Sequence, residues 1–284
     1  MAEAKNTYER ELNVALKLAR EAGALALDYY GSTLLVEHKG SDQQEPVTQA
    51  DRAVNELIVR AIGEEFPADG ILAEESVDTF ARLDKERVWI IDPLDGTSGF
   101  IARNGDFAVQ IGLADKGESV LGVVYQPLPD VLQWAVKGTG AWIERAGFEK
   151  ERGQVSGQRE IARMRLAASR SHRSPRMDTV VRALGVKEEV RRGSVGVKVG
   201  LIVERQCDLY VHLSGRTKQW DTCAPEIILR EAGGRFTTLF GAPLPYNTPD
   251  VQNHNGLVAT NGAAHDLVIE SLAPLLREFG RVPV

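Results

Sequence analysis

The stretch from Trp89 to Thr97 constrains this chain more than any other, because it reads W-I-I-D-P-L-D-G-T. The apolar run Val88–Ile91 is too short for a helix and is soon followed by a proline, so it predicts a buried strand that stops at Asp92. The glycine after Asp95 permits a tight bend, and the threonine that follows is favourable at a helix start. Asp92 and Asp95 are therefore expected to lie together where a strand passes into a turn.

Two carboxylates at this spacing repel each other and raise a pKa unless a cation lies between them. A hard divalent metal ion bound by oxygen atoms is the natural cation for such a turn. The alternative is a solvated turn, since Asp, Pro and Gly are all common turn residues. An EF-hand calcium loop does not fit, because it needs acids at alternate positions and a distal Glu.

Acidic residues also flank other predicted elements. Glu74 lies in A-E-E-S, directly after the short apolar run Gly70–Leu72, which predicts a neighbouring strand. Asp51 ends a pattern, Thr48-x-x-Asp51, that resembles a capping box ahead of an apolar-periodic helix. Each of these acids also has a purely structural interpretation.

Asp221 opens a predicted helix far downstream. That helix carries Pro225 in its first turn and stops at Gly233-Gly234. Aspartate is a favoured N-cap, so Asp221 alone is as well explained by helix capping as by function. Together with the acids above, it places carboxylates at the ends of four separate elements.

Composition and charge fit a globular enzyme that acts on small molecules. The 284 residues are 43% hydrophobic and 26% charged, with a net charge of −6 that argues against broad nucleic-acid binding. An anionic substrate then needs a local positive site, which bound metal ions supply. Cys207 and Cys223 are the only cysteines, which favours buried thiols in a reducing cytoplasm over a disulfide framework. We expect neither a signal peptide nor a membrane span, since no apolar run approaches the ~20 residues that a span needs.

The hydrophobic pattern predicts a mixed α/β (α+β) fold that begins with a helix. Gly40–Pro46 predicts a mobile loop, and the polar stretch Arg145–Arg159 is the expected seam between two halves, residues 1–150 and 151–284. Strands are predicted at Phe107–Leu113, Val120–Tyr125, Leu132–Val136, Leu166–Ala168, Asp208–His212, Phe236–Leu239 and Leu257–Thr260. Helices are predicted at Tyr8–Tyr30, Pro175–Leu184, Val195–Arg205, Ala224–Ala232 and Ala263–Phe279.

The motifs E-E-S, D-P-L-D-G-T and W-D-x-x-A-P occur in this order, and V-T-Q-A-D at Val47–Asp51 adds a fourth. In these motifs the chain resembles the inositol monophosphatase superfamily of metal-dependent phosphomonoesterases. The resemblance extends from the first helix to about Asn261. It implies a layered αβαβα sandwich.

Within that superfamily the chain is most similar to the 3'(2'),5'-bisphosphate nucleotidases of the CysQ-like branch. The likeness rests on S-R-S-H at Ser169–His172, R-N-G-D-F at Arg103–Phe107 and K-Q-W-D-T-C-A-P-E at Lys218–Glu226. The stretch Ser194–Lys198, S-V-G-V-K, falls where that branch carries a Gly-rich loop ending in lysine. One departure is Ser98-Gly99-Phe100, where bacterial members usually have Lys-Glu-Phe.

The resemblance implies a centre that holds two or three Mg²⁺ ions, and oxygen-only ligands favour Mg²⁺ over Zn²⁺. Glu74, Asp92 and the Leu94 carbonyl would hold the ion that activates water. Asp92, Asp95 and Asp221 would hold the ion that stabilises the leaving alkoxide, and a third, weaker ion would contact Glu74. Two ions of this kind clamp the attacking and leaving oxygens of a phosphate ester.

The resemblance also implies catalytic roles for Thr97 and Asp51. Thr97, oriented by Asp51, would position the attacking water or accept its proton. The backbone N–H groups of Gly96 and Thr97 begin a helical turn, which suits a bound phosphate.

The substrate that the CysQ-like branch implies is 3'-phosphoadenosine 5'-phosphate. Its second phosphate would meet His172 and Lys198, and Ser169 and Ser194 would add hydrogen bonds. Judged from the residues alone, a lone His or Lys is more often a surface residue. Two further pocket candidates are His254 and Arg216.

Several alternatives stay open from sequence. Inositol 1-phosphate is the chief rival substrate, and fructose 1,6-bisphosphate is another. The non-enzymatic alternative is a metal-dependent nucleotide sensor, against which the presence of both Thr97 and Asp51 argues. We expect a small phosphorylated substrate, no nucleic-acid polymer and no membrane as partners, and a homodimer is compatible with the sequence.

Overall fold

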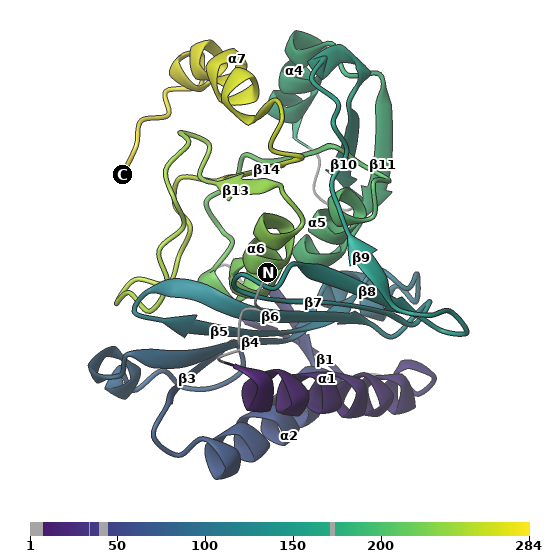
Figure 1. Cartoon of the computed structure of the whole chain (residues 1–284), viewed down its shortest axis with the longest axis vertical. Helices are drawn as coiled ribbons and strands as arrows, with labels where there is room; N and C mark the ends of the chain where they lie inside the picture. Colours follow the sequence, from purple (N-terminus) through teal and green to yellow (C-terminus); the bar gives the residue numbers. More distant parts are fainter. Residues whose placement is uncertain (1–7, 34, 40–44, 171–173) are drawn as a thin grey trace, which may run out of the picture.

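Three pairs of helices alternate with two sheets in this computed structural model, which describes residues 8–33, 35–39, 45–170 and 174–284 (Figure 1). The first pair covers the outer face of a seven-stranded sheet, the second pair lies between the two sheets, and the third covers the far face of a five-stranded sheet. The pairs are α1 (Glu9–Tyr30) with α2 (Gln49–Glu65), α5 (Val195–Val203) with α6 (Gln219–Glu231), and α4 (Pro175–Leu184) with α7 (His265–Glu278). The expected αβαβα sandwich is confirmed.

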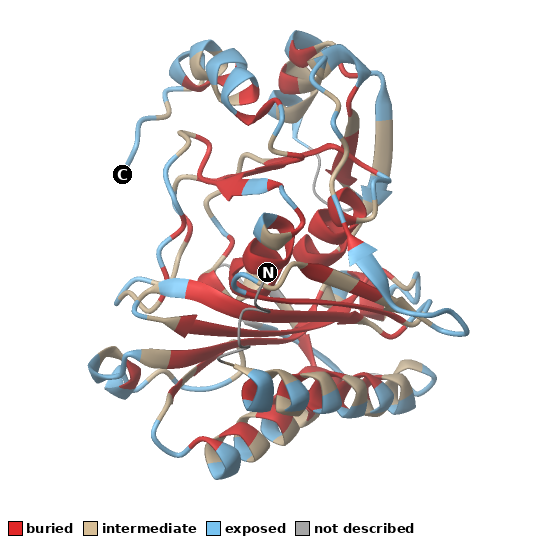
Figure 2. Cartoon of the chain, viewed as in Figure 1, coloured by how far each residue is buried: buried red, intermediate tan, exposed pale blue. Residues whose placement is uncertain are grey.

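The seven-stranded sheet follows the chain in simple order from β3 to β9. Its first two strands are parallel and all other neighbours are antiparallel. Its central strands are buried along almost their whole length because helices cover both faces (Figure 2). The strands are β3 (Gly70–Ala73), β4 (Arg87–Asp95), β5 (Ala108–Asp115), β6 (Glu118–Gln126), β7 (Val131–Val136), β8 (Ala141–Arg145) and β9 (Glu151–Gly153).

The five-stranded sheet has the order β11-β10-β12-β14-β13, with β10 parallel to both of its neighbours. Its strands are β10 (Arg165–Ser169), β11 (Glu188–Arg192), β12 (Leu209–His212), β13 (Arg235–Thr237) and β14 (Leu257–Thr260). The remaining elements are a β1–β2 hairpin (Val36–Lys39 and Glu45–Thr48), the short helix α3 (Thr97–Ile101) and two 3₁₀ turns, η1 (Ala81–Asp84) and η2 (Ile161–Arg163).

A pair of glycines lets α6 sit directly on the seven-stranded sheet. Gly112 of β5 and Gly122 of β6 face each other in the antiparallel ladder. A Cβ on Gly122 would lie 2.3 Å from the carbonyl oxygen of Ala224, and one on Gly112 would lie 2.7 Å from the sulfur of Cys223. The backbone of α6 therefore approaches the sheet more closely than side chains would allow, which fixes the depth of that helix.

Strand β4 differs from its prediction, because it continues past Asp92 and through Pro93 to Asp95. Its pairing with β5 shifts register between Asp92 and Asp95, so no ladder hydrogen bond is required from the proline. The prediction that the strand ends at Asp92 was wrong for this reason. Gly96 makes the expected bend with a φ of 100°, and Thr97 is the first residue of α3.

Other boundaries also needed correction. Helix α6 begins at Gln219, so Pro225 lies beyond its first turn, and its N-cap is Lys218 rather than an aspartate. Glu45 and Pro46, expected in a loop, lie in β2, while the rest of that loop, residues 40–44, falls outside the described residues. The hydrophobic pattern did not predict β1, β8, β9 or β11, which are short strands rich in polar residues.

Among the described residues, no helix is both long enough and apolar enough to cross a membrane. The longest, α1, buries one stripe that includes Ala15, Ala19 and Ala22 against the sheet, and its other face stays open to solvent.

The close approach of α6 to Gly112 and Gly122 predicts an effect on stability. Gly122→Ala places a methyl group against helix backbone that cannot move aside, so we expect a loss of about 2–3 kcal/mol in the free energy of unfolding, measured by urea denaturation. Gly63→Ala in α2 is the matched control, because the nearest atom to its new Cβ is 3.9 Å away. That control should be neutral or stabilising by up to about 1 kcal/mol. Equal effects of the two substitutions would contradict the close approach of α6.

Candidate metal centre and active site

Three carboxylates meet where the seven-stranded sheet reaches α6. Asp92 and Asp95 come from the end of β4, and Asp221 from the first turn of α6. One oxygen from each lies within 4.8 Å of the others. Residues more than a hundred positions apart in the chain are thus brought together, as the sequence motifs predicted.

Glu74 joins this group from the neighbouring strand. Strand β3 runs parallel to β4, so the carboxyl ends of both strands reach the same edge of the sheet. The Glu74 N–H donates to the carbonyl of Ile91 at 3.1 Å, and the charge of its side chain raises the pKa of Asp92. The N–H of Leu94 donates to the Asp92 carboxylate at 3.1 Å, which fixes the turn between the two β4 aspartates.

Asp221 has both of the roles that the sequence left open. It is the third residue of α6, and its carboxylate accepts the N–H of Lys218, the N-cap residue, at 2.6 Å. This capping contact orients the side chain toward Asp92 and Asp95. Helix capping and membership of the acidic cluster are therefore compatible in one residue.

The cluster is electrostatically strained without a cation. Burial raises the pKa of Asp92 well above its usual range, and the charges of Glu74, Asp95 and Asp221 raise it further. Asp221 keeps partial solvent access, yet burial of its carboxyl group, together with the charge of Asp95, raises its pKa to about 8. The donor set consists of oxygen atoms alone and fits a hard divalent ion such as Mg²⁺.

Asp95 is held by donors from the start of α5 and from β5. Its carboxylate accepts the Ser194 hydroxyl at 2.5 Å, the Gln110 amide at 2.6 Å, and the N–H groups of Gly196 and Val195 at 2.8 and 3.1 Å. Burial raises the pKa of Asp95, and these hydrogen bonds offset only part of that rise. The four donors fix the orientation of this carboxylate before any ion binds.

Lys198 lies inside the protein rather than on its surface. The residue is only 4% exposed, and its ammonium nitrogen lies 4.8 Å from the ring centroid of Tyr210. Burial lowers its pKa, while the charges of Asp95, Asp221 and Asp106 raise it. The simple interpretation of Lys198 as a surface residue is therefore wrong, and its charge faces the acidic cluster.

Thr97 and Asp51 form a separate pair beside the cluster. The Thr97 hydroxyl lies 2.9 Å from one oxygen of Asp51 and 3.2 Å from the Leu94 carbonyl. The other Asp51 oxygen accepts the N–H and the hydroxyl of Thr48 at 2.8 and 2.6 Å, which confirms the predicted capping box. Burial raises the pKa of Asp51, although the hydrogen bonds from Thr48 and Thr97 oppose the rise.

Of the residues predicted to bind substrate or line the pocket, only some lie near the acidic cluster. Ser194 is buried, and its single proton is committed to Asp95 while its oxygen accepts the N–H of Val197. Ser169 is the last residue of β10, and His172 lies outside the described residues. His254 is exposed and pairs with Asp250 at 2.7 Å, and Arg216 is also exposed, so neither joins the cluster.

Two residues that support the site were missed from sequence. Gln110 is fully buried in the middle of β5, where a glutamine within an apolar strand is itself a signal. Asp106 is buried, accepts the N–H of Gly193 at 2.9 Å and pairs with Arg170 at 2.6 Å. It lies within the R-N-G-D-F motif, but nothing in the local sequence identifies those partners.

Comparison with known proteins agrees with this geometry. The family model described as "Inositol monophosphatase family" matches residues 7–277. The 3'(2'),5'-bisphosphate nucleotidase CysQ of Escherichia coli is 35% identical over 83% of this chain and 93% of its own length. The inositol-1-monophosphatase of Bacillus subtilis is 31% identical over 90% of this chain and 94% of its own length.

A solved structure of CysQ from Bacteroides thetaiotaomicron superposes with a TM-score of 0.77 at 31% identity, and the match covers 91% of this chain and 99% of that one. The layered fold and the cluster of oxygen ligands thus occur together with a match over nearly the whole sequence. This chain belongs to the inositol monophosphatase family and is a metal-dependent phosphatase.

Proposed function

We propose that this phosphatase uses Mg²⁺ to remove the 3'-phosphate from 3'-phosphoadenosine 5'-phosphate, giving adenosine 5'-phosphate and inorganic phosphate. The observation that carries the proposal is the gathering of Asp92, Asp95 and Asp221 next to the Thr97–Asp51 pair. Hydrolysis of a phosphate monoester needs charge neutralisation and a positioned water more than it needs a covalent nucleophile. In this site the acidic cluster would hold the neutralising cations, and the Thr97–Asp51 pair would position the water.

The proposed metal ligands are those that the family resemblance implies. Glu74, Asp92 and the Leu94 carbonyl would hold one ion, and Asp92 would share a second with Asp95 and Asp221. A third, weaker ion would contact Glu74. When bound, Mg²⁺ supplies positive charge to the phosphate oxygens and lowers the pKa of a water. The buried acidic cluster supports this assignment because it needs cations to stay ionised.

Thr97 and Asp51 would handle the proton of the attacking water. The Thr97 hydroxyl has one proton, and donating it to Asp51 leaves the hydroxyl oxygen able to accept a proton from water. Burial makes Asp51 a stronger base than a surface aspartate, since it raises the pKa of the carboxyl group. The N–H groups of Gly96 and Thr97 would face the phosphate that is cleaved.

The bisphosphate substrate is supported by cationic groups near the cluster and by the relatives named above. Lys198 is a buried cation beside Asp95 and Asp221, and His172, Ser169 and Ser194 would complete the contacts to the second phosphate. The hydroxyl of Ser194 would have to turn away from Asp95 to donate to a phosphate oxygen, because Asp95 already takes its only proton.

Inositol 1-phosphate is the second candidate substrate. The 31% identity to an inositol-1-monophosphatase over most of both chains favours it, as does the departure at Ser98-Gly99-Phe100 from the usual bacterial pattern. Fructose 1,6-bisphosphate is the third candidate substrate. We further propose a cytoplasmic enzyme, which the two buried free thiols, Cys207 and Cys223, support.

Phosphate release across three esters tests the substrate. With Mg²⁺ present, we expect kcat/KM for 3'-phosphoadenosine 5'-phosphate to exceed that for inositol 1-phosphate and fructose 1,6-bisphosphate. Lys198→Met should raise KM for the bisphosphate by roughly tenfold, the scale of one charge-assisted contact. A higher kcat/KM for inositol 1-phosphate would transfer the assignment to that ester, and no release from any of the three esters would reject all of them as substrates.

Thr97 substitutions test the proton path. Thr97→Val keeps the shape but removes the hydroxyl, so kcat should fall by a hundredfold or more with little change in KM. Thr97→Ser is the matched control, since it keeps a hydroxyl that can reach Asp51. A change confined to KM would show instead that Thr97 only contacts the substrate.

The acidic cluster predicts a dependence of metal stabilisation on pH. The pKa of Asp221 is about 8 in the folded, metal-free protein and about 3.9 when unfolded, so the stability it contributes is present at low pH and lost as pH rises through 8. Mg²⁺ should reverse this loss, because it binds the ionised carboxylates. At pH 6 the ion must first displace the proton held by Asp221, whereas at pH 8.5 that proton is mostly gone. The rise in melting temperature on adding Mg²⁺ should therefore be larger at pH 8.5 than at pH 6.

Asp221→Asn is the control for that experiment. It removes the titrating charge, and its amide oxygen can still accept the Lys218 N–H. The metal-free variant should lose less stability between pH 6 and 8.5, and Mg²⁺ should stabilise it less at pH 8.5. A wild-type Mg²⁺ effect that does not change with pH would contradict the cluster as the binding site.

A further inference from the structure

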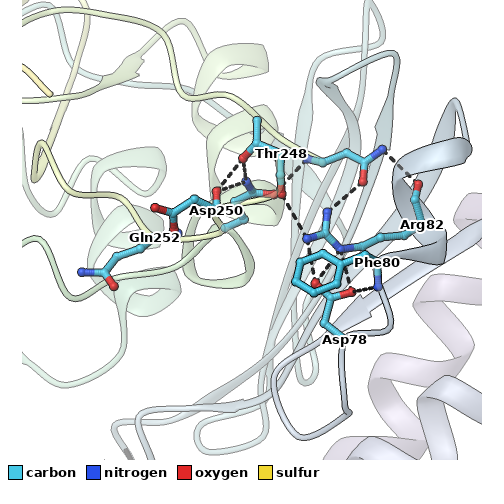
Figure 3. Close-up of polar contacts among 8 residues, drawn as sticks. Asp78, Phe80, Arg82, Thr248, Asp250 and Gln252 are labelled. Carbon is cyan, nitrogen blue, oxygen red and sulfur yellow. Dashed lines mark hydrogen bonds and ion pairs between the residues drawn. The ribbon is translucent and has the colours of Figure 1, made fainter. Parts of the chain in front are cut away.

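Two of the candidate metal ligands, Glu74 and Asp221, lie on segments that are far apart in the sequence. Glu74 directly follows β3 and is followed by a long connection, residues 75–86, before β4 begins. Asp221 belongs to α6, more than a hundred residues later. A buried arginine in the connection, Arg82, joins the two segments (Figure 3).

Arg82 first organises its own loop. It is 3% exposed, lies in η1, and holds Asp78 in a bidentate pair with distances of 2.8 to 3.2 Å. Asp78 also accepts the N–H of Phe80 at 2.9 Å. The loop after Glu74 is therefore folded around one guanidinium group.

The same guanidinium group reaches across to the segment that follows β13. Its Nη1 donates to the Asn247 side chain at 2.9 Å, and its Nη2 donates to the carbonyl of Thr248 at 3.0 Å. The Asn247 amide returns hydrogen bonds to the carbonyls of Arg82 and Lys85, at 3.2 and 3.1 Å. Figure 3 shows the Arg82 guanidinium group between Asp78 of its own loop and Thr248 of the other.

That second segment holds the first residue of α6. The side-chain oxygen of Gln219 accepts the Asn247 N–H at 2.9 Å, and its amide donates to the Thr248 hydroxyl at 2.5 Å. The Gln219 N–H donates to the carbonyl of Val251 at 2.9 Å. Gln219 is buried and lies two residues before Asp221, so the link is continuous from the Glu74 loop to the Asp221 turn.

We propose that Arg82 is a positioning residue that keeps Glu74 in register with Asp221 through Asn247 and Gln219. The inference rests on the proposed role of both acids as metal ligands. Residues that orient metal ligands without touching the ion typically change metal affinity by 10–100-fold when they are removed. Arginine suits the task because its planar fork binds one carboxylate and two further acceptors at once, which lysine cannot do.

Asn247→Gly tests the link without removing the arginine. Asn247 has a φ of 55°, which glycine adopts freely, and the backbone N–H to Gln219 is retained. Only the three side-chain hydrogen bonds to Arg82 and Lys85 are lost. We expect the dissociation constant for Mg²⁺, measured by titration calorimetry without substrate, to rise about tenfold.

Arg82→Lys should weaken Mg²⁺ binding in the same way, because its ammonium group can keep Asp78 but not the whole set of acceptors. Arg145→Met is the matched control, since Arg145 also joins separate segments, by pairing with Glu151 and Glu204, but contacts neither loop. The control should lower thermal stability and leave Mg²⁺ affinity unchanged. Hydrogen exchange within residues 75–86 of the metal-free protein should increase in both Arg82→Lys and Asn247→Gly.

Two outcomes would overturn the inference. One is a loss of thermal stability in Asn247→Gly and Arg82→Lys with wild-type Mg²⁺ affinity, which would make Arg82 purely structural. The other is a wild-type protein that binds no Mg²⁺. Weaker Mg²⁺ binding in both variants, combined with a wild-type protein that hydrolyses none of the three esters, would support the inference and reject the proposed substrates separately.

Discussion

Mutual repulsion among Asp92, Asp95 and Asp221 is the constraint on which the rest of the site depends. Carboxylates within 4.8 Å in a largely buried place separate or take up protons unless rigid surroundings hold them and a cation neutralises them. The sandwich supplies the rigidity, because β4 is buried on both faces and α6 rests on a pair of glycines. The same repulsion makes the site attract divalent ions and, through them, phosphate esters.

The structure divides its buried carboxylates into two chemical kinds. Those of the cluster face one another, so each neighbour raises the pKa and a cation restores the ionised form. Asp51 instead accepts hydrogen bonds from Thr48 and Thr97, which leaves burial as the main cause of its raised pKa. The same residue type, aspartate, can therefore serve as a metal ligand in the cluster and as a base at Asp51, because the two environments differ.

The sequence predicted those parts of the structure that depend on neighbouring residues. Helix α4 matches its predicted bounds because proline, apolar spacing and a final glycine all lie within twelve positions. The passage of β4 through Pro93 was not predictable, since it depends on a register shift against another strand. The resemblance implied a substrate contact for Lys198, but the burial of this lysine was not predictable from neighbouring residues, because it depends on Tyr210 and on acids from three other segments. Nothing near Arg82 in the sequence identifies Asn247 as its partner.

Ser194 links the metal cluster to the start of α5, so these two parts of the site cannot vary independently. Its hydroxyl donates to Asp95 and accepts the N–H of Val197, so one side chain both caps α5 and orients a carboxylate of the cluster. Because the Ser194 hydroxyl is already used in these two contacts, it has little freedom to form a new hydrogen bond to the substrate. Discrimination between esters with one and two phosphates then falls to charge, and Lys198, which feels the charges of Asp95, Asp106 and Asp221, is the cation that the proposal assigns to the second phosphate. Metal binding would neutralise two of these acids, Asp95 and Asp221, and so leave more of the Lys198 charge available to an anionic substrate.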